Sequence, residues 1–499
     1  MEKQPEALKI KREIGLIGGI SIVSGTMIGS GIFMSPQFVL SYVGSPGASL
    51  LVWALSGVLS MFAALCYTEL GTIITESGGE VIYIFRTYGS LLAFFATLNL
   101  IVLSKPFGLA AMAISISEYA MAPFFPGCAP PQLVVKCAAA GAILLVAIVN
   151  CLNVRLAIRV QVVFLIAKVL ALSIIAIGGI VAVAQDSSVI VDNLRFENAF
   201  VDTGTSLSTF GMAFYQGLWS FAGWYNLNFV TEELKRPEVN LPRAIVFGVS
   251  LVTLLYLLVN VSYLSVLTPK ELISSNAVAI TWGYDKYMIY LYILISYSLA
   301  ELHADLNCRN KVLGSWGWIM SLAAALSAFG SLNGSLFTGG RIMFVAAREG
   351  LLPDILSMAH VRRLTPSTSL IFTTCISLVV IMSGDFETIV NYSSFAGWLF
   401  YAITVSGVIY LRIKKPNLHR PYKVFILLPV LVIIASIFLV LAPILDNPQI
   451  EYLYVILFLL SGIIVYIPFI HYKVCPGLLT KVTMFLQLFL EVAPAEKNL

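Results

Sequence analysis

Long apolar stretches, each about as long as a membrane-spanning helix, follow one another along almost the whole chain. A spanning helix needs roughly 20 mostly apolar residues, and short polar segments separate twelve stretches of this kind. We expect spans at residues 15–40, 46–72, 88–121, 132–152, 157–184, 207–231, 243–267, 314–343, 366–383, 389–412, 424–443 and 451–471. The pattern therefore predicts an all-α polytopic membrane protein with twelve transmembrane helices.

Composition and charge agree with this class and argue against others. Of the 499 residues, 59% are hydrophobic and 11% are charged, which is more apolar surface than a soluble core of this size could bury. The net charge of +4 is spread over short loops, so no nucleic-acid partner is indicated. The four histidines are scattered and the glycine-rich motif lies inside an apolar span, so we expect no enzyme, metal or cofactor.

The placement of the basic residues indicates which loops face the cytoplasm. Arg12, Arg155, Lys235, Arg348 and Lys414 are among the many that fall in alternate loops or in the termini. By the positive-inside rule, these loops and both termini are cytoplasmic. The loop that contains the cysteine at position 128 is then extracellular, where disulfide bonds persist.

Glycines interrupt two predicted spans at matching places. The first span contains a cluster from Gly25 to Gly31, and the sixth contains Gly217 and Gly223. Matched breaks indicate inverted repeats with discontinuous helices. The helix that resumes after Gly29 directs backbone donors at a carboxylate, and unpaired carbonyls can accept from an ammonium, so a zwitterionic substrate fits. For either cluster alone, close helix packing is the simpler interpretation; the matched pair favours a binding site.

Lys168 lies in the middle of the fifth predicted span, within FLIAKVLAL. A lysine there costs about 2.5–3.5 kcal/mol even on the scale measured by membrane insertion, so we expect it to face the protein interior. A purely structural lysine, paired with backbone carbonyls, is the alternative.

Several motifs resemble one family, the light subunits of heteromeric amino-acid transporters within the amino acid, polyamine and organocation superfamily. The matching strings are GTMIGSGIF (25–33), ESGGE (76–80), NFVTEEL (228–234), AREGLLP (347–353), VRRLTP (361–366) and SSFAGWLF (393–400). Further strings are similar to the cystine and dibasic amino-acid exchanger and to its aromatic-preferring sister branch: SEYAMAPFFPGCAPPQ (117–132), EYLYVILFLLSG (451–462) and FLEVAP (489–494).

The resemblance implies a LeuT-like fold, a 5+5 inverted repeat with broken helices 1 and 6 plus two C-terminal helices. It also implies sodium-independent exchange of amino acids at the plasma membrane, with the apical membrane as one location. The expected layout is a cytoplasmic N-terminus (1–14), a ten-helix transport core (15–412), helices 11 and 12 (413–471) and a cytoplasmic C-terminus (472–499).

The same resemblance assigns site residues. The substrate's α-carboxylate and α-amino group would bind backbone atoms of Thr26, Ile28, Gly29, Ser30 and Gly31. Trp219 and Phe221 would close over the substrate, with Ala222 and Gly223 beside its side chain. Trp219 could equally be an aromatic that fills the protein interior.

Selectivity would depend on four positions. Lys105 aligns with a cation of the cystine exchangers, whereas Ala222 stands where the dibasic exchanger has an aspartate. Without that carboxylate, a cationic side chain would be desolvated without a partner. Gly397, next to Trp398, stands where the anionic exchanger has a second arginine. We therefore expect neutral substrates, aromatic ones and cystine among them; a cystine/dibasic or a cystine/acidic exchanger is the alternative.

Two further roles follow from the resemblance. Lys168 would replace the sodium ion of related carriers, and Cys128 would form a disulfide with a single-span type II glycoprotein, the heavy subunit. A free thiol is the alternative for Cys128.

Residues 284–310 match nothing in the family, so we expect an extracellular insertion there, with Cys308 as a rival thiol. An anion-conducting channel lined by Lys105 and Lys168 is the alternative from a different functional class.

Overall fold

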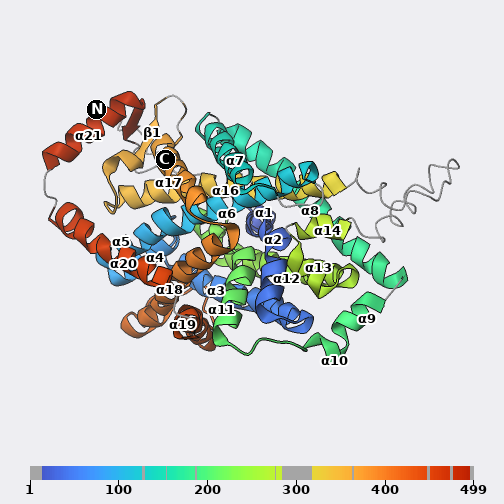
Figure 1. Cartoon of the computed structure of the whole chain (residues 1–499). Coiled ribbons are helices and arrows are strands. Elements are labelled where there is room, and N and C mark those ends of the chain that lie inside the picture. Colours follow the sequence, from blue (N-terminus) through green and yellow to red (C-terminus); the bar gives the residue numbers. More distant parts are fainter. Residues whose placement is uncertain are drawn as a thin grey trace.

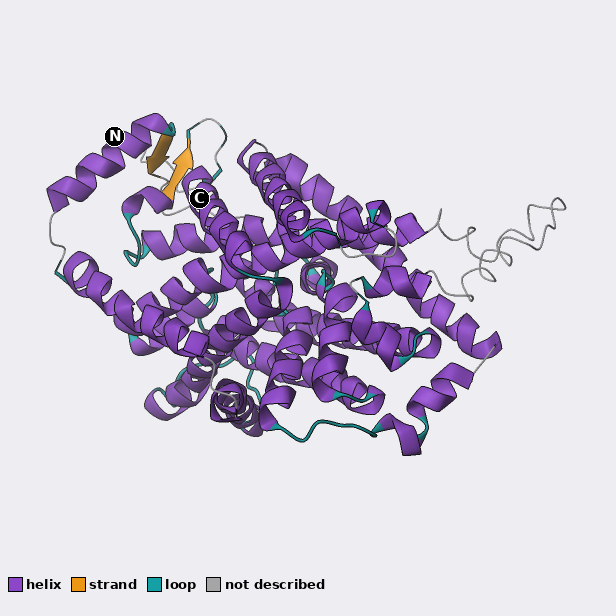
Figure 2. Ribbon diagram, in the orientation of Figure 1, coloured by secondary structure: helices purple, strands orange, loops and turns teal. Residues whose placement is uncertain are grey.

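Helices form nearly all of the chain that the structure describes (Figure 1, Figure 2). The computed structural model describes residues 14–125, 130–152, 154–185, 188–275, 277–283, 317–361, 363, 365–446, 450–472 and 476–494. Residues 1–13, the predicted insertion at 284–310 with Cys308, and Cys128 lie outside the described residues. The all-helical fold class predicted from the sequence is confirmed.

The elements of the first half, in chain order, are α1 (Leu16–Met27), α2 (Gly31–Val43), α3 (Pro46–Ile73), α4 (Glu80–Tyr88), α5 (Ser90–Leu98), the π-helix η1 (Asn99–Ser104), α6 (Lys105–Met121), the 3-10 helix η2 (Ala122–Phe124), α7 (Gln132–Leu152), α8 (Val154–Gln185), α9 (Ser188–Leu194) and α10 (Phe196–Ala199).

The elements of the second half are α11 (Leu207–Ser220), the 3-10 helix η3 (Asn226–Glu233), α12 (Pro237–Val266), α13 (Pro269–Ser274), α14 (Val278–Gly283), α16 (Gly317–Arg348), the 3-10 helix η4 (Asp354–Ser357), β1 (Met358–His360), α17 (Ser367–Ser383), α18 (Phe386–Lys414), α19 (Leu427–Asp446), α20 (Ile450–Val465), the π-helix η5 (Tyr466–His471), α21 (Pro476–Phe489) and β2 (Val492–Pro494).

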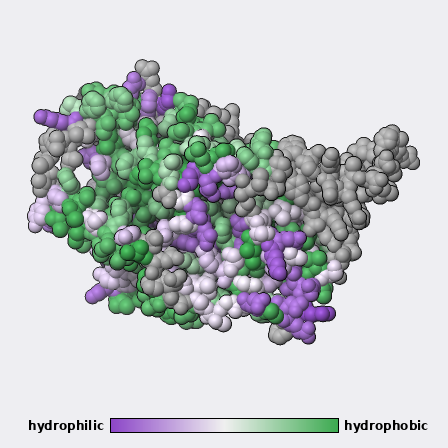
Figure 3. All heavy atoms as spheres, viewed as in Figure 1, coloured by the Kyte–Doolittle hydropathy of each residue, from purple (hydrophilic) through white to green (hydrophobic). Residues whose placement is uncertain are grey.

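The helices match the twelve predicted spans. Among the described residues, seven helices are long and apolar enough to cross a membrane, and the count is nine if each of two bent pairs is one span. The three remaining predicted spans coincide with α11, α16 and α17. Many leucine and isoleucine side chains on these helices are exposed at the protein surface, which suits contact with lipid rather than with water. Figure 3 shows apolar side chains over much of this face, and hydrophilic ones gathered around α9 and α10.

The first predicted break is present between α1 and α2, whose axes differ by 49°. The second lies after α11, where the helix ends at Ser220 and a turn leads into η3. The two broken helices lie in the middle of the bundle, because α2 packs against α11 and α1 against α12 (Figure 1). The helices α3, α6 and α16 surround them.

A pair of short strands is an element that the apolar pattern did not predict. β1 and β2 pair in antiparallel fashion, with Met358 opposite Pro494 and His360 opposite Val492. Three-residue strands are too short to give a period-2 signal, and their partner is more than a hundred residues away in sequence. The pairing attaches the C-terminal segment to the loop that follows α16.

Candidate functional site

The two helix breaks touch each other at glycines. A Cβ on Gly31 would lie 2.5 Å from the Cα of Ser220, and one on Gly223 would lie 2.9 Å from Thr26 Oγ1. Gly223 also has φ = +113°, which residues with a side chain rarely adopt. These glycines therefore allow close packing of the helices, which was the alternative interpretation, and the helices are also broken there.

Lys168 anchors the break in the first span from the side. Its ammonium is fully buried and donates to Gly25 O at 3.0 Å and to Ser331 Oγ at 2.7 Å. Ser331 in turn donates to Ile28 O at 3.1 Å. Carbonyls freed by the break are thus paired with side chains from α8 and α16, which agrees with the prediction that Lys168 faces the interior.

Tyr256 joins the two breaks. Its hydroxyl lies 2.7 Å from Met27 O and 3.1 Å from Ser220 O, and the ring is fully buried. Sequence reasoning did not identify this tyrosine, because a tyrosine within an apolar stretch is also a common filler of the protein interior. Its position between two unwound segments becomes visible only once α12 packs against α1.

The start of α2 leaves backbone donors free of intrahelical partners. The first N–H groups of any helix lack an acceptor within it, and the helix dipole places partial positive charge there. Gly29 and Ser30 precede this helix and Gly31 opens it. This end of α2 is therefore suited to a carboxylate.

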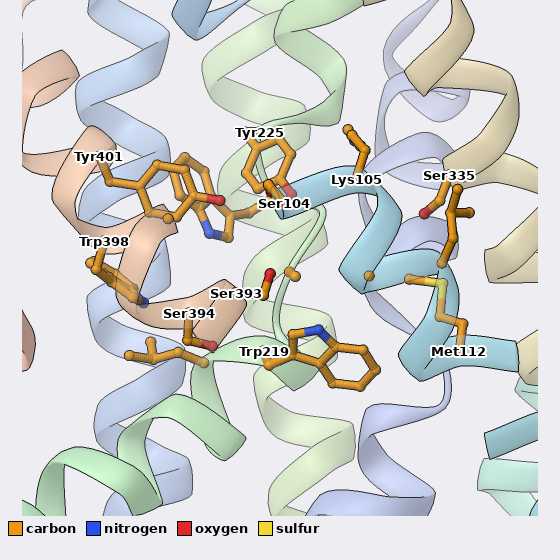
Figure 4. Close-up of a pocket in the computed structure, with 16 residues that line it drawn as sticks. Ser104, Lys105, Met112, Trp219, Tyr225, Ser335, Ser393, Ser394, Trp398 and Tyr401 are labelled. Atoms are coloured by element: carbon orange, nitrogen blue, oxygen red, sulfur yellow. The ribbon is translucent and has the colours of Figure 1, made fainter. Parts of the chain in front are cut away.

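A pocket lies beside the breaks, between α6, the α11–η3 connection and α18 (Figure 4). Its volume is about 670 Å³ with the space open to solvent included. It is lined by Ser104, Lys105, Gly108, Leu109, Met112, Leu218, Trp219, Ala222, Trp224, Tyr225, Ser335, Ser393, Ser394, Gly397, Trp398 and Tyr401.

The structure brings together five of the predicted site residues in this lining: Lys105, Trp219, Ala222, Gly397 and Trp398. The other predicted residues of the breaks do not line it; they are Thr26, Ile28, Gly29, Ser30, Gly31 and Gly223. Phe221 is fully buried away from the pocket, where its ring packs against Trp53 and Tyr256.

Aromatic rings form one wall of the pocket. The ring of Tyr401 packs against Trp398 and Trp224 with centroids 5.4 Å apart in both cases, and against Tyr225 at 5.8 Å. Trp219 stands apart from this group (Figure 4). Its ring lies edge-on to that of Phe386, with centroids 5.1 Å apart. Of these rings, sequence reasoning had identified Trp219 and Trp398. A wall of this kind offers π faces to an apolar or aromatic side chain.

Lys105 is the cation that lines the pocket. Its ammonium lies 5.6 Å from the ring centroid of Tyr225 and 5.4 Å from that of Phe229, so two aromatic faces surround it. A Cβ on Gly397, another residue of the lining, would meet nothing closer than Tyr401 at 3.8 Å. A Cβ at this position would thus be in ordinary van der Waals contact with Tyr401, and Lys105 is the one cation among the described residues that line the pocket.

Comparisons with known proteins agree with these features. The family model described as amino acid permease matches residues 14–469. The human b(0,+)-type amino acid transporter 1 is 44% identical over 498 residues, 99% of this chain and 96% of that protein. The mouse large neutral amino acids transporter small subunit 2 is 40% identical over 88% of this chain and 77% of its own length. The human cystine/glutamate transporter is 36% identical over 99% and 93%.

A solved structure supports the fold independently of sequence. A manganese transporter from Eremococcus coleocola superposes with a TM-score of 0.52 at 12% identity, over 95% of this chain and 98% of that one. At this identity the likeness concerns the arrangement of the helices alone.

Proposed function

Because the chain belongs to the amino acid permease family, we propose that it is a sodium-independent exchanger of neutral L-amino acids, aromatic ones and cystine included. The observation that supports this most strongly is the pair of helix breaks beside a pocket with an aromatic wall. The substrate's α-carboxylate would bind at the start of α2, and its side chain would extend toward Trp398 and Tyr401.

The charges of the pocket support a neutral side chain. A dibasic substrate would bring a second positive charge to Ala222, where the pocket has no carboxylate to pair with it. This charge would also lie in the same pocket as the ammonium of Lys105. Desolvation of an unpaired charge is unfavourable, and like charges repel. An acidic substrate would meet Lys105 but no second cation, since a glycine stands at position 397. Both charged classes should therefore be transported less well than tyrosine.

Sodium independence is supported by Lys168. Its ammonium donates to Gly25 O and to Ser331 Oγ and so holds the broken first helix from the side. A carrier with this charge built in needs no cation from solution to hold the same oxygens together.

We further propose that the chain is a light subunit whose Cys128 forms a disulfide with a single-span glycoprotein, and that the complex resides in the plasma membrane with both termini cytoplasmic. One relative is named a small subunit, and the predicted extracellular loop contains this cysteine. Cys128→Ser should abolish the reducible high-mass band of the heterodimer on a non-reducing gel. Cys137→Ser, a change at a described free cysteine, is the matched control.

The test is uptake of labelled tyrosine, cystine, arginine and glutamate into sodium-free proteoliposomes that contain the chain with its heavy subunit. We expect rapid tyrosine uptake that requires a preloaded neutral amino acid, with slower arginine and glutamate uptake. Uptake into empty vesicles at the same rate would instead indicate a channel. Arginine uptake as fast as that of tyrosine would refute the role given to Ala222.

A further inference from the structure

A buried carboxylate lies close to the pocket without lining it. Gly78 and Gly79, with φ of +125° and +57°, turn the chain back into the bundle, so that Glu80 at the start of α4 is only 4% exposed. Tyr67 donates a hydrogen bond to Glu80 Oε2 at 3.1 Å. Buried carboxylates are rarely left without a compensating charge.

The other carboxylate of this loop shows how an ordinary loop glutamate behaves. Glu76 lies at the surface, with its side chain 47% exposed, and pairs with Arg86 at 2.6 Å. An ion pair of this kind is open to solvent and contributes little to stability. The burial of Glu80 is therefore a property of that position and not of the loop as a whole.

The opposite charge that interacts with Glu80 is the ammonium of Lys105. Gly79 packs directly on the ring of Phe229, and the ammonium of Lys105 lies 5.4 Å from the same ring. Glu80 and Lys105 attract each other as opposite charges, although in the part of the chain that the structure describes the two side chains form no direct ion pair. Glu80 thus directly follows the glycine that packs on the ring of Phe229, and Lys105, which lines the pocket, faces the same ring.

We propose that Glu80 is the counter-charge of Lys105 and a specificity residue of the pocket: its ionised form reserves the pocket for neutral side chains, and its protonated form admits a side-chain carboxylate. The inference rests on the proposed exchange function and names a second substrate class for the same site. Glu80 does not touch the substrate; it acts through the charge that Lys105 presents.

The pH range follows from the surroundings of Glu80. The titratable groups that face it are Tyr67 of α3, Lys105 of α6, Tyr225 of the second break and Tyr401 of α18. Glu80 lies between the spans α3 and α5–α6, and burial raises the pKa of its carboxyl to about 7 against the opposing effects of Tyr67 and Lys105. Below that pH Glu80 takes up a proton, while a glutamate substrate stays ionised down to about pH 4.3.

The experiment compares glutamate with tyrosine uptake by the full complex in preloaded, sodium-free proteoliposomes between pH 8 and pH 6. We expect the ratio of glutamate to tyrosine uptake to rise at least about fivefold on acidification. Glu80→Gln should give a high ratio that no longer depends on pH. Glu76→Gln, in the same loop, should behave like the unmodified chain.

Lys105→Met separates this mechanism from a general effect of pH, because without the cation the acid-induced rise in glutamate uptake should disappear. A ratio that stays constant with pH in the unmodified chain would overturn the proposal, even if Glu80→Gln fails to fold. So would a rise that persists in Lys105→Met. If the unmodified complex does not exchange tyrosine at all, that result would instead contradict the proposed function itself.

Discussion

Replacement of Lys168 by methionine tests how the broken first helix is held. Methionine keeps a long, unbranched side chain but has no ammonium, so Gly25 O loses its donor and Ser331 Oγ loses one partner. Ser331 can still donate to Ile28 O. The contact between α8 and the break should weaken while the remainder of the site stays intact.

The magnitude can be estimated from these contacts. Hydrogen bonds from a charged group contribute about 1.5–3 kcal/mol each, and a buried carbonyl without a donor costs about 1–3 kcal/mol. Removal of the buried charge offsets part of this, because a central lysine costs about 2.5–3.5 kcal/mol to insert. Folding should therefore change little. A loss of about 2 kcal/mol at the break corresponds to roughly 30-fold in the population of the arrangement that depends on Lys168.

The assay is initial-rate tyrosine exchange in proteoliposomes, with the thermal unfolding temperature of the same purified complex in detergent. We expect exchange to fall at least about tenfold while the unfolding temperature shifts by only a few degrees. Lys136→Met is the matched control, because Lys136 also donates to a carbonyl, Met382 O at 3.1 Å, but at the surface.

Two results would refute this reasoning. Exchange by Lys168→Met within about threefold of the unmodified complex would show that the charge has no part in transport. A complex that no longer folds would favour the purely structural interpretation of Lys168, provided that Lys136→Met folds normally.

Three other changes have defined outcomes. Ala222→Asp places a carboxylate in the pocket, and arginine uptake should rise at least about fivefold relative to tyrosine uptake; an unchanged ratio would mean that the side chain of a dibasic substrate points elsewhere. Arg412→Met removes the donor whose Nε lies 2.9 Å from the buried Glu69, which keeps Arg420 at 3.8 Å and the Val424 N–H at 2.8 Å, so the complex should lose less than the about 3–5 kcal/mol of an uncompensated buried charge, seen as a lower unfolding temperature. Gly31→Ala forces a Cβ to 2.5 Å from Ser220 Cα, and tyrosine exchange should fall more than tenfold; a fully active variant would show that the two breaks can separate freely.

Much of the fold could be predicted from the chain because membrane spans are a local property. Twenty apolar residues in a row have to pair their backbone groups internally in lipid, and a helix is the way to do this within one segment. Glycine clusters in two such segments marked the breaks, since unwound backbone needs residues without steric restriction. The cost of a charge in lipid also placed Lys168 in the interior.

The partners of those residues could not be predicted in the same way. Which side chains reach the carbonyls at the break depends on how α8, α12 and α16 pack, and neither Tyr256 nor Ser331 has a local signal that separates it from an ordinary interior residue. The burial of Phe221 away from the pocket is likewise decided by the turn that follows α11.

Glu80 shows most clearly the difference between what the sequence predicts and what the tertiary structure decides. In the sequence it belongs to a polar, glycine-rich loop between two spans, where a carboxylate is normally solvated, and Glu76 in the same loop is solvated in this way. The backbone at Gly78 and Gly79 turns the second carboxylate inward, where Tyr67 donates a hydrogen bond to it. The sequence by itself determined the number of spans, their breaks and the residue types available for binding. Only the tertiary structure decided which charges face each other, because that depends on contacts between segments far apart in the chain.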